Sequence, residues 1–156
     1  MNKNNRPGED FSRQVFDNYR AMIENTSDGI VILQDKVIKF VNRRILELLD
    51  YDREELIGEG FLEIVDEKDR ELAEERYSAR MRGEDISRVY ESGLVTKSGS
   101  YLPVEVKADR ISYDGRPADL VLIRDLTERR RADRRLRETQ GYFQKLFNLL
   151  VDPVVL

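Results

Sequence analysis

Apolar and polar residues alternate most clearly in the second half of the chain. In YLPVEVKADRIS, residues 101–112, the apolar side comprises Leu102, Val104, Val106 and Ala108. A period of two predicts a strand with one covered face. SRVYESGLVTK precedes this strand and ADLVLIRDL follows it, and the turn sequences KSGS and SYDGRP separate the three segments. The pattern therefore predicts three consecutive strands of an antiparallel sheet.

The first half combines a helix with two shorter strands. Apolar residues at spacings of three and four predict a helix, for which Asp10 is the candidate cap. These apolar residues are Phe11, Val15, Tyr19, Met22 and Ile23. GIVILQ and KVIKFVN are rich in Ile and Val and predict two strands. Asp35-Lys36 between them favours a tight hairpin turn. The polar residues 1–10 are expected to be disordered.

Short helices are predicted between the two groups of strands. Asn42 is a candidate cap for the helix in RRILELL. Gly58 and Gly60 interrupt DREELIGEGFLEIV, so one-turn helices are expected there. DEKDRELAEERYSARMRG predicts a longer helix that stops near Gly83. Its expected buried stripe is narrow and comprises Leu72, Glu75/Arg76, Ala79 and Met81.

The C-terminal segment predicts a helix with a heptad pattern. Its apolar and small residues are spaced 4, 3, 4, 3 and 4 apart, and they are Ala132, Leu136, Thr139, Phe143, Leu146 and Leu150. This is the a/d rhythm of a coiled coil. The pattern favours a two-helix linker over residues 128–142, and a single helix that packs on its own sheet stays open as the alternative.

Six arginines between Arg129 and Arg137 raise the question of nucleic-acid binding. Acidic residues are interleaved with them, and Asp133 with Arg137 lies at the i,i+4 spacing of a helical ion pair. No aromatic residue stands among the arginines to stack on bases. The sequence therefore predicts a solvated helix face and no nucleic-acid partner.

Composition narrows the chemistry further. The 156 residues include no Cys, His or Trp, and the net charge is -4. Without Cys or His, thiolate and imidazole metal sites and the usual general base are excluded. The polar start MNKNNRPGED is not a signal peptide, and no apolar run approaches the length of a membrane helix. These features predict a soluble, cytoplasmic protein without catalytic activity of its own. The acids Asp66, Glu67 and Asp69 suit a helix start.

Five segments, in this order, resemble a PAS domain, a small α+β sensory fold. They are FDNYRAMIENTSDGIVIL; KFVNRRILELLDYDREELIG, with Asn42, Tyr51 and Gly58 at matching places; VDEKDR; TKSGSYLPVEV; and LIRDLTERRRADRRLRE, with its D-x-T triplet. The resemblance covers about residues 11–138. It implies a five-stranded antiparallel sheet with short helices on one face, an N-terminal helix and a coiled-coil-like C-terminal signalling helix.

The resemblance also implies a domain organisation. The PAS domain with its N-terminal helix would occupy residues 11–127, and the signalling-helix linker residues 128–142. FQKLFNLLVDPVVL, residues 143–156, is similar in pattern to YRAMIENTSDGIVI, residues 19–32. We therefore expect residues 143–156 to be the truncated start of a second PAS domain. A C-terminal helix that docks on the same domain is the alternative.

PAS domains often hold a ligand between the sheet and the helices. Family members that bind haem generally use a His, and light-sensing flavin members use a Cys where this chain has NRRILELL. The resemblance thus argues against haem and cysteinyl-flavin photochemistry and leaves the cofactor unknown. The candidate pocket residues are Ile32, Val41, Asn42, Ile45, Leu48, Phe61, Ile64, Tyr77, Met81, Tyr90, Leu94, Val104, Val106, Leu122 and Arg124. The alternative is that the apolar residues of this set are simply core.

Asp125 and Thr127 are the first and last residues of the D-x-T triplet, and in the family this pair helps to couple the last strand to the outgoing helix. A Thr hydroxyl at a helix start can cap free backbone N–H groups. The resemblance therefore implies a sensor module that dimerises through its N- and C-terminal helices and signals to an output domain, with a histidine kinase as the expected output. A cyclase or phosphodiesterase output and a ligand-free dimerisation module remain alternatives.

Overall fold

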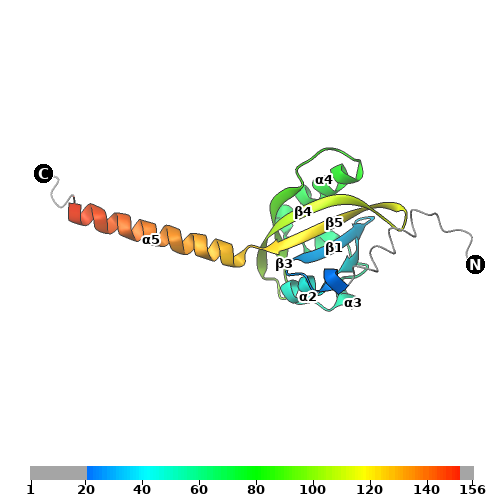
Figure 1. Ribbon diagram of the computed structural model, residues 1–156, viewed down its shortest axis with the longest axis horizontal. Helices are drawn as coiled ribbons and strands as arrows, with labels where there is room; N and C mark the ends of the chain where they lie inside the picture. The colour runs from blue at the N-terminus through cyan, green and yellow to red at the C-terminus, as the bar shows by residue number, and fades with distance from the viewer. Residues whose placement is uncertain (1–20, 152–156) are drawn as a thin grey trace, which may run out of the picture. The chain divides into compact units, whose positions relative to one another are not determined.

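The computed structural model describes residues 21–151, without the side chains of residues 143, 147 and 149–151. Figure 1 shows its strands and helices. The strands are β1 (Gly29–Gln34), β2 (Val37–Val41), β3 (Val89–Val95), β4 (Tyr101–Tyr113) and β5 (Arg116–Asp125). The helices are α2 (Arg43–Leu49), α3 (Arg53–Leu56), α4 (Arg70–Met81), α5 (Thr127–Val151) and the 3-10 turns η1 (Phe61–Ile64) and η2 (Glu67–Asp69). One compact unit ends at Asp125 and a second begins at Leu126.

The five strands form one antiparallel sheet in the order β2-β1-β5-β4-β3. Asp35 and Lys36 join β1 to β2 with positive φ angles of 55° and 63°, as the right-handed twist of a tight hairpin requires. Asp114 and Gly115 join β4 to β5 in the same way, with φ angles of 51° and 75°. The sequence prediction of an antiparallel sheet with these two hairpins is confirmed.

The short helices pack on one face of this sheet. Ile45 and Leu49 of α2, Phe61 of η1 and Tyr77 of α4 belong to the same buried cluster as the inward side chains of β1, β4 and β5. On β4 the inward side chains are the four predicted from the alternation, Leu102, Val104, Val106 and Ala108. The predicted α+β architecture with a covered sheet face is therefore present.

The buried face of α4 differs from the predicted stripe. Leu72 is 46% exposed, whereas Ala73, Tyr77 and Arg80 are buried. These three residues follow the i, i+4, i+7 spacing of one helix face. Ala79 is buried as predicted and Met81 is partly buried. The predicted stripe was therefore wrong by about one residue in phase, and it did not include the buried Arg80.

A smaller cluster covers part of the opposite sheet face. It contains Ile30, Ile32, Phe40 and Ala118, with Ile23 packed against them. Residues 21–24 are helical, which fits the end of the predicted N-terminal helix. Its remaining predicted residues, the expected cap Asp10 and the expected disordered segment 1–10 lie outside the described residues.

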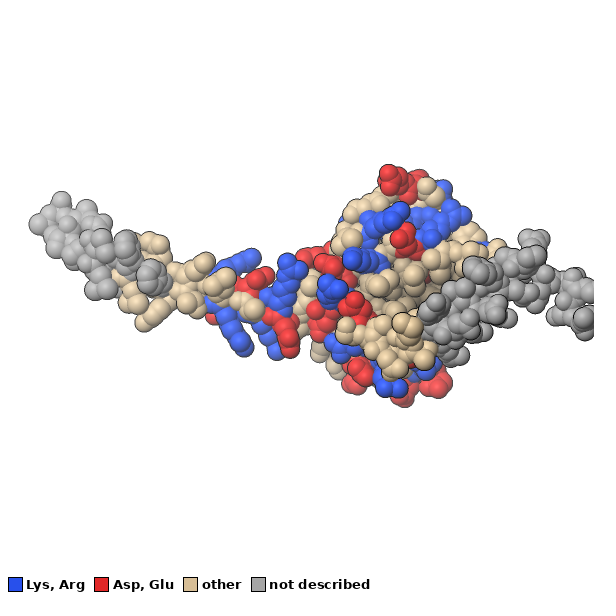
Figure 2. Space-filling model, in the orientation of Figure 1, with Lys and Arg blue, Asp and Glu red and all other residues tan. Residues whose placement is uncertain are grey.

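The second unit consists of α5, which continues through Gly141 without a break. Leu136 is 58% exposed on it, and Tyr142 is exposed as well. Acidic and basic side chains alternate along the first part of the helix (Figure 2). Residues 143–151 continue this helix, and residues 152–156 are outside the description. No helix within the described range is both long and apolar enough to span a bilayer.

Replacing Gly29 with Ala is expected to lower the free energy of unfolding by about 1–3 kcal/mol. The added Cβ would collide with Cδ1 of Ile45 and come within 3.0 Å of its Cγ1, and Ile45 is fully buried. Gly60→Ala is the matched control, because no described atom lies within 4 Å of its Cβ position. Urea unfolding followed by circular dichroism measures both variants. Equal stability of the two would contradict the predicted close packing at Gly29.

Candidate functional site

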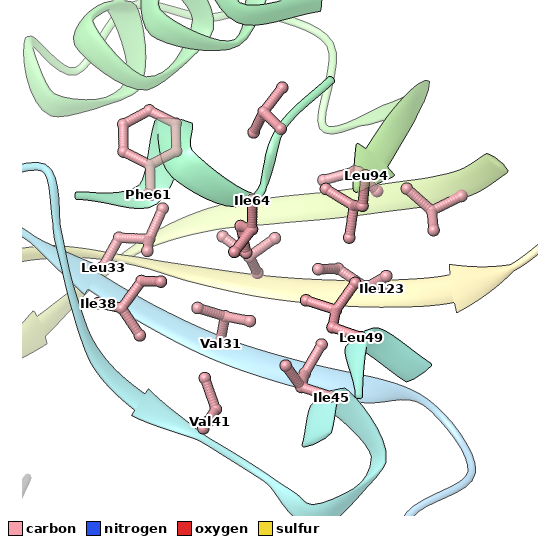
Figure 3. Close-up of a cluster of buried hydrophobic side chains, with 14 of the residues drawn as sticks. Val31, Leu33, Ile38, Val41, Ile45, Leu49, Phe61, Ile64, Leu94 and Ile123 are labelled. Atoms are coloured by element: carbon pink, nitrogen blue, oxygen red, sulfur yellow. The ribbon is translucent and has the colours of Figure 1, made fainter. Parts of the chain in front are cut away.

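A small cavity lies between the inner face of the sheet and the elements η1 and α4. Its volume is about 50 Å³. Figure 3 shows Leu33, Phe61, Ile64 and Ile123 around this region of the core. The residues that line it are Val31, Leu33, Phe61, Ile64, Val65, Ala73, Arg80, Tyr90, Ser92, Leu94, Val106, Asp119, Val121 and Ile123.

The strand period places these groups at the cavity. On β5 every second side chain points inward, so Asp119, Val121 and Ile123 all line it. On β1 the same rule brings in Val31 and Leu33. β5 lies between β1 and β4 in the sheet. The central strand therefore contributes both apolar wall and one carboxylate.

A buried ion pair forms the polar part of the cavity wall. The Nε and Nη2 atoms of Arg80 donate to Oδ1 and Oδ2 of Asp119 at 2.9 Å and 2.8 Å. The Arg80 and Asp119 side chains are 7% and 0% exposed. The third guanidinium nitrogen, Nη1, is buried and finds no hydrogen-bond acceptor among the described residues. A buried charged donor without a partner is costly, so this atom calls for an explanation.

Burial and pairing act on the two ionisable groups in different ways. Burial raises the pKa of the Asp119 carboxyl above its ordinary value, and this outweighs the lowering by Arg80. Burial would lower the pKa of Arg80, but the hydrogen bonds and charge of Asp119 raise it overall. Tyr90 lies close enough to raise the pKa of Arg80 further by its charge and hydrogen-bonding capacity, although no described acceptor meets hydrogen-bond geometry with Nη1. Arg80 therefore stays a cation at any physiological pH.

Five of the predicted pocket residues line this cavity: Phe61, Ile64, Tyr90, Leu94 and Val106. They come from η1 and from the consecutive strands β3 and β4. Tyr90 also stacks under the guanidinium of Arg76, at 3.8 Å from its ring centre. The fold thus brings these five side chains together around one space.

Six others belong to the surrounding core without lining the cavity. Val41, Ile45, Tyr77 and Val104 are buried in the main cluster, and Leu48 and Met81 are partly buried against it. Tyr77 has a role in the fold, because its hydroxyl accepts a hydrogen bond from the backbone N–H of Lys36 at 3.0 Å. This contact holds the β1–β2 hairpin against α4.

Ile32, Leu122 and Arg124 lie on the other side of the sheet, and the fold does not bring them to this cavity. Ile32 is buried in the smaller cluster, with Leu122 packed against it. Arg124 is exposed and its Nε lies 3.4 Å from Oδ1 of Asp28. Ile32 is one residue out of phase with the cavity residues on β1, and Leu122 and Arg124 are out of phase on β5.

Asn42 is fully buried but acts as a structural cap away from the cavity. Its Oδ1 accepts from the backbone N–H groups of Ile30 at 2.9 Å and Ile45 at 3.3 Å. Its Nδ2 donates to the carbonyl oxygens of Ile23 at 2.9 Å and Asp28 at 3.0 Å. The predicted helix cap is confirmed, and the same side chain also fastens the segment before β1.

Arg80 and Asp119 are the site residues that sequence reasoning missed. Two signals were available. The spacing of Ala73, Tyr77 and Arg80 places an arginine on the buried face of α4, and Asp119 is in phase with Val121 and Ile123 in a strand. Within residues 21–151 no three carboxylates are grouped so as to hold a metal ion.

Comparisons with known proteins agree with this fold. The family model described as PAS domain matches residues 27–128. The methyl sulfide methyltransferase-associated sensor of Methanosarcina acetivorans is 30% identical over 118 residues, which cover 74% of this chain and 12% of that protein. Sporulation kinase A of Bacillus subtilis is 23% identical over 141 residues, which cover 90% of this chain and 23% of that protein. The chain thus spans less than a quarter of the length of either relative.

Solved structures of PAS domains have the same fold. The PAS domain of an HTR-like protein from Haloarcula marismortui matches with a TM-score of 0.57 and 28% identity, covering 72% of this chain and 98% of that one. Two further similar structures are domains of sensor histidine kinases, each with a TM-score of 0.60. From the family match and the order of the strands in the sheet, we conclude that this chain belongs to the PAS domain family.

Proposed function

We propose that this PAS domain senses a change at its inner cavity and relays it to an output domain through α5. The observation that supports the proposal is the course of one strand. Asp119, Val121 and Ile123 of β5 line the cavity, and β5 ends at Asp125, two residues before the first residue of α5, Thr127. A shift of β5 in response to the cavity's contents would therefore move the start of the helix.

A histidine kinase is the output that we propose for the whole protein. The similarity to domains of sensor histidine kinases supports it. A cytoplasmic location follows from this proposal, because a histidine kinase uses ATP. A cyclase or phosphodiesterase output remains the alternative.

The proposed assembly is a homodimer. The heptad pattern of α5 and the exposed Leu136 on it support a partner helix. In this proposal residues 128–142 serve as the linker and residues 143–156 begin a second PAS domain. Sedimentation analysis of the chain with and without Leu136→Glu tests the assembly, and a dimer that persists unchanged in the variant would contradict a role for this heptad position.

A ligand-free relay is the second candidate, and the small size of the cavity favours it. The cavity measures only about 50 Å³, because the domain's own side chains fill most of the space between the sheet and the helices. Native mass spectrometry of the purified chain, compared with its denatured mass, distinguishes the two candidates. An excess mass in the native state supports a retained ligand, and equal masses favour the relay.

Asp125→Ala is expected to uncouple output from the sensor in the full signalling protein while the domain stays folded. Asp125 is half-buried at the end of β5, directly before the residues that start α5. The readout is autophosphorylation, or the activity of whichever output domain follows, measured with and without the stimulus. We expect the response to fall at least several-fold.

Asp109→Ala is the matched control, because Asp109 is an exposed carboxylate on β4 of the same sheet. It should leave the response unchanged. An unaltered response in Asp125→Ala would reject the coupling role. An equal loss of response in both variants would show a general effect of removing a negative charge from the sheet and not a specific role of Asp125.

A further inference from the structure

The unpaired nitrogen of Arg80 indicates what the cavity can hold. Two of the three guanidinium nitrogens donate to Asp119, and Nη1 is buried without an acceptor among the described residues. Arg80 and Asp119 both line the cavity. A ligand oxygen in the cavity would satisfy this donor, and a hydrogen bond to a charged group is among the stronger ones.

Charge balance decides which kind of oxygen fits. The guanidinium of Arg80 is already neutralised by the carboxylate of Asp119, which is fully buried. An anionic ligand would add a second negative charge beside this carboxylate in a space without a further cation among its lining residues. Burying an unpaired charge costs far more than burying a dipole. The pair therefore favours a neutral acceptor.

Cavity size sets the dimensions of the ligand. One water molecule needs roughly 10–15 Å³ of cavity volume. The cavity of about 50 Å³ therefore has room for about four water-sized groups, which corresponds to a molecule of about four non-hydrogen atoms. Apart from the ion pair and the hydroxyl groups of Tyr90 and Ser92, the cavity wall is aliphatic and aromatic, with Leu33, Phe61 and Ile64 among its residues. This wall suits a short apolar body.

We infer that the cavity binds a small neutral organic molecule whose carbonyl or hydroxyl oxygen accepts a hydrogen bond from Nη1 of Arg80. Its apolar end packs against Leu33, Phe61 and Ile64. Tyr90 and Ser92 also line the cavity and carry hydroxyl groups that can assist a ligand hydroxyl. The inference rests on the proposed sensory function and names the ligand class for it.

Acetone and acetate form the test pair, because they have the same number of non-hydrogen atoms and differ in charge. Each is titrated into the isotope-labelled 156-residue chain, and NMR follows the backbone amides around the cavity and the side-chain signals of Arg80. We expect saturable shifts with acetone and a Kd on the order of 1 mM. Acetate should bind about 10-fold more weakly or not at all.

Two variants separate the polar contact from the available space. Arg80→Met/Asp119→Leu removes the donor and its counter-charge together, and acetone affinity should fall about 10-fold or more. Val106→Ile keeps the ion pair but fills part of the cavity, so it should weaken acetone binding as well. If the double variant does not fold, Val106→Ile and the acetone–acetate comparison still decide.

Three results would overturn the inference: acetate binding as tightly as acetone, acetone shifts that do not saturate, or acetone affinity unchanged in both variants. The coupling experiment on Asp125 is independent of these. If acetone does not bind and Asp125→Ala loses coupling, the ligand class is rejected and the proposed coupling of the sheet to α5 is kept. If acetone binds and Asp125→Ala leaves coupling unaltered, the ligand class is supported and the proposed coupling through Asp125 is rejected.

Discussion

Replacement of Arg80 by Met is expected to lower the free energy of unfolding by about 3–5 kcal/mol. The change leaves the fully buried carboxylate of Asp119 without the two hydrogen bonds of 2.9 Å and 2.8 Å that it accepts from Arg80. Domains of this size have total stabilities of about 5–15 kcal/mol, so the variant would lose a large share. Urea unfolding followed by circular dichroism is the suitable measurement, because the chain has no Trp.

The double variant Arg80→Met/Asp119→Leu is the control for this prediction. Replacing both partners with apolar side chains removes the charges as well as their attraction, and such exchanges are often neutral. We expect the double variant to be more stable than either single variant, Arg80→Met or Asp119→Leu. Losses that simply add up would contradict a coupled buried pair.

The Arg80→Met variant should also acquire a distinct pH dependence. Burial already raises the pKa of Asp119, and loss of the guanidinium raises it further. A carboxyl whose folded-state pKa exceeds its unfolded value stabilises the fold at low pH, and this contribution is lost as the pH rises through the folded-state pKa. Relative to the double variant, Arg80→Met should therefore gain stability on acidification. A pH-independent difference between the two would contradict this account.

The sequence predicted the sheet well because its signals are local. Alternation over β4 and the turn residues Asp35-Lys36 and Asp114-Gly115 each depend on a few neighbouring residues. All three predictions are confirmed by the strand register and the positive φ angles. The order of the strands in the sheet was not predicted, since no local pattern encodes it, and it comes from the structure.

The sides of the central strands were harder to predict. GIVILQ of β1 is apolar at nearly every position, and all six residues are buried. A strand covered on both faces has no polar positions to mark the inner one. This is why Ile32 and Leu122 were assigned to the pocket although their side chains lie on the other face.

The polar part of the site was missed for a different reason. Arg80 and Asp119 are 39 positions apart, and each is charged, so each alone resembles a solvent-exposed residue. Only their pairing permits both to be buried. A search for charged residues in phase with buried apolar positions would have selected both of them. It would also have selected charged residues that are exposed.

Asn42→Ala is expected to lower the free energy of unfolding by about 2–4 kcal/mol. Asn42 is fully buried and its amide caps α2 and also binds backbone groups of the preceding segment and β1. The Ala variant leaves the N–H of Ile30 and the carbonyl of Asp28 without this partner in the protein interior. Hydrogen exchange should show early opening of residues 21–30, while the β3–β4 hairpin stays protected.

Asn42→Asp separates the acceptor from the donor in this network. The new carboxylate can still accept from the N–H groups of Ile30 and Ile45, but it faces the carbonyl oxygens of Ile23 and Asp28, which require a donor. We expect a loss of stability at neutral pH that is partly regained on acidification, because the protonated carboxyl supplies one donor again and its folded-state pKa is raised. Asn42→Ala has no carboxyl group at this position and should not regain stability on acidification. Equal pH profiles of the two variants would show that the cap of α2, and not the link to residues 23–28, accounts for the role of Asn42.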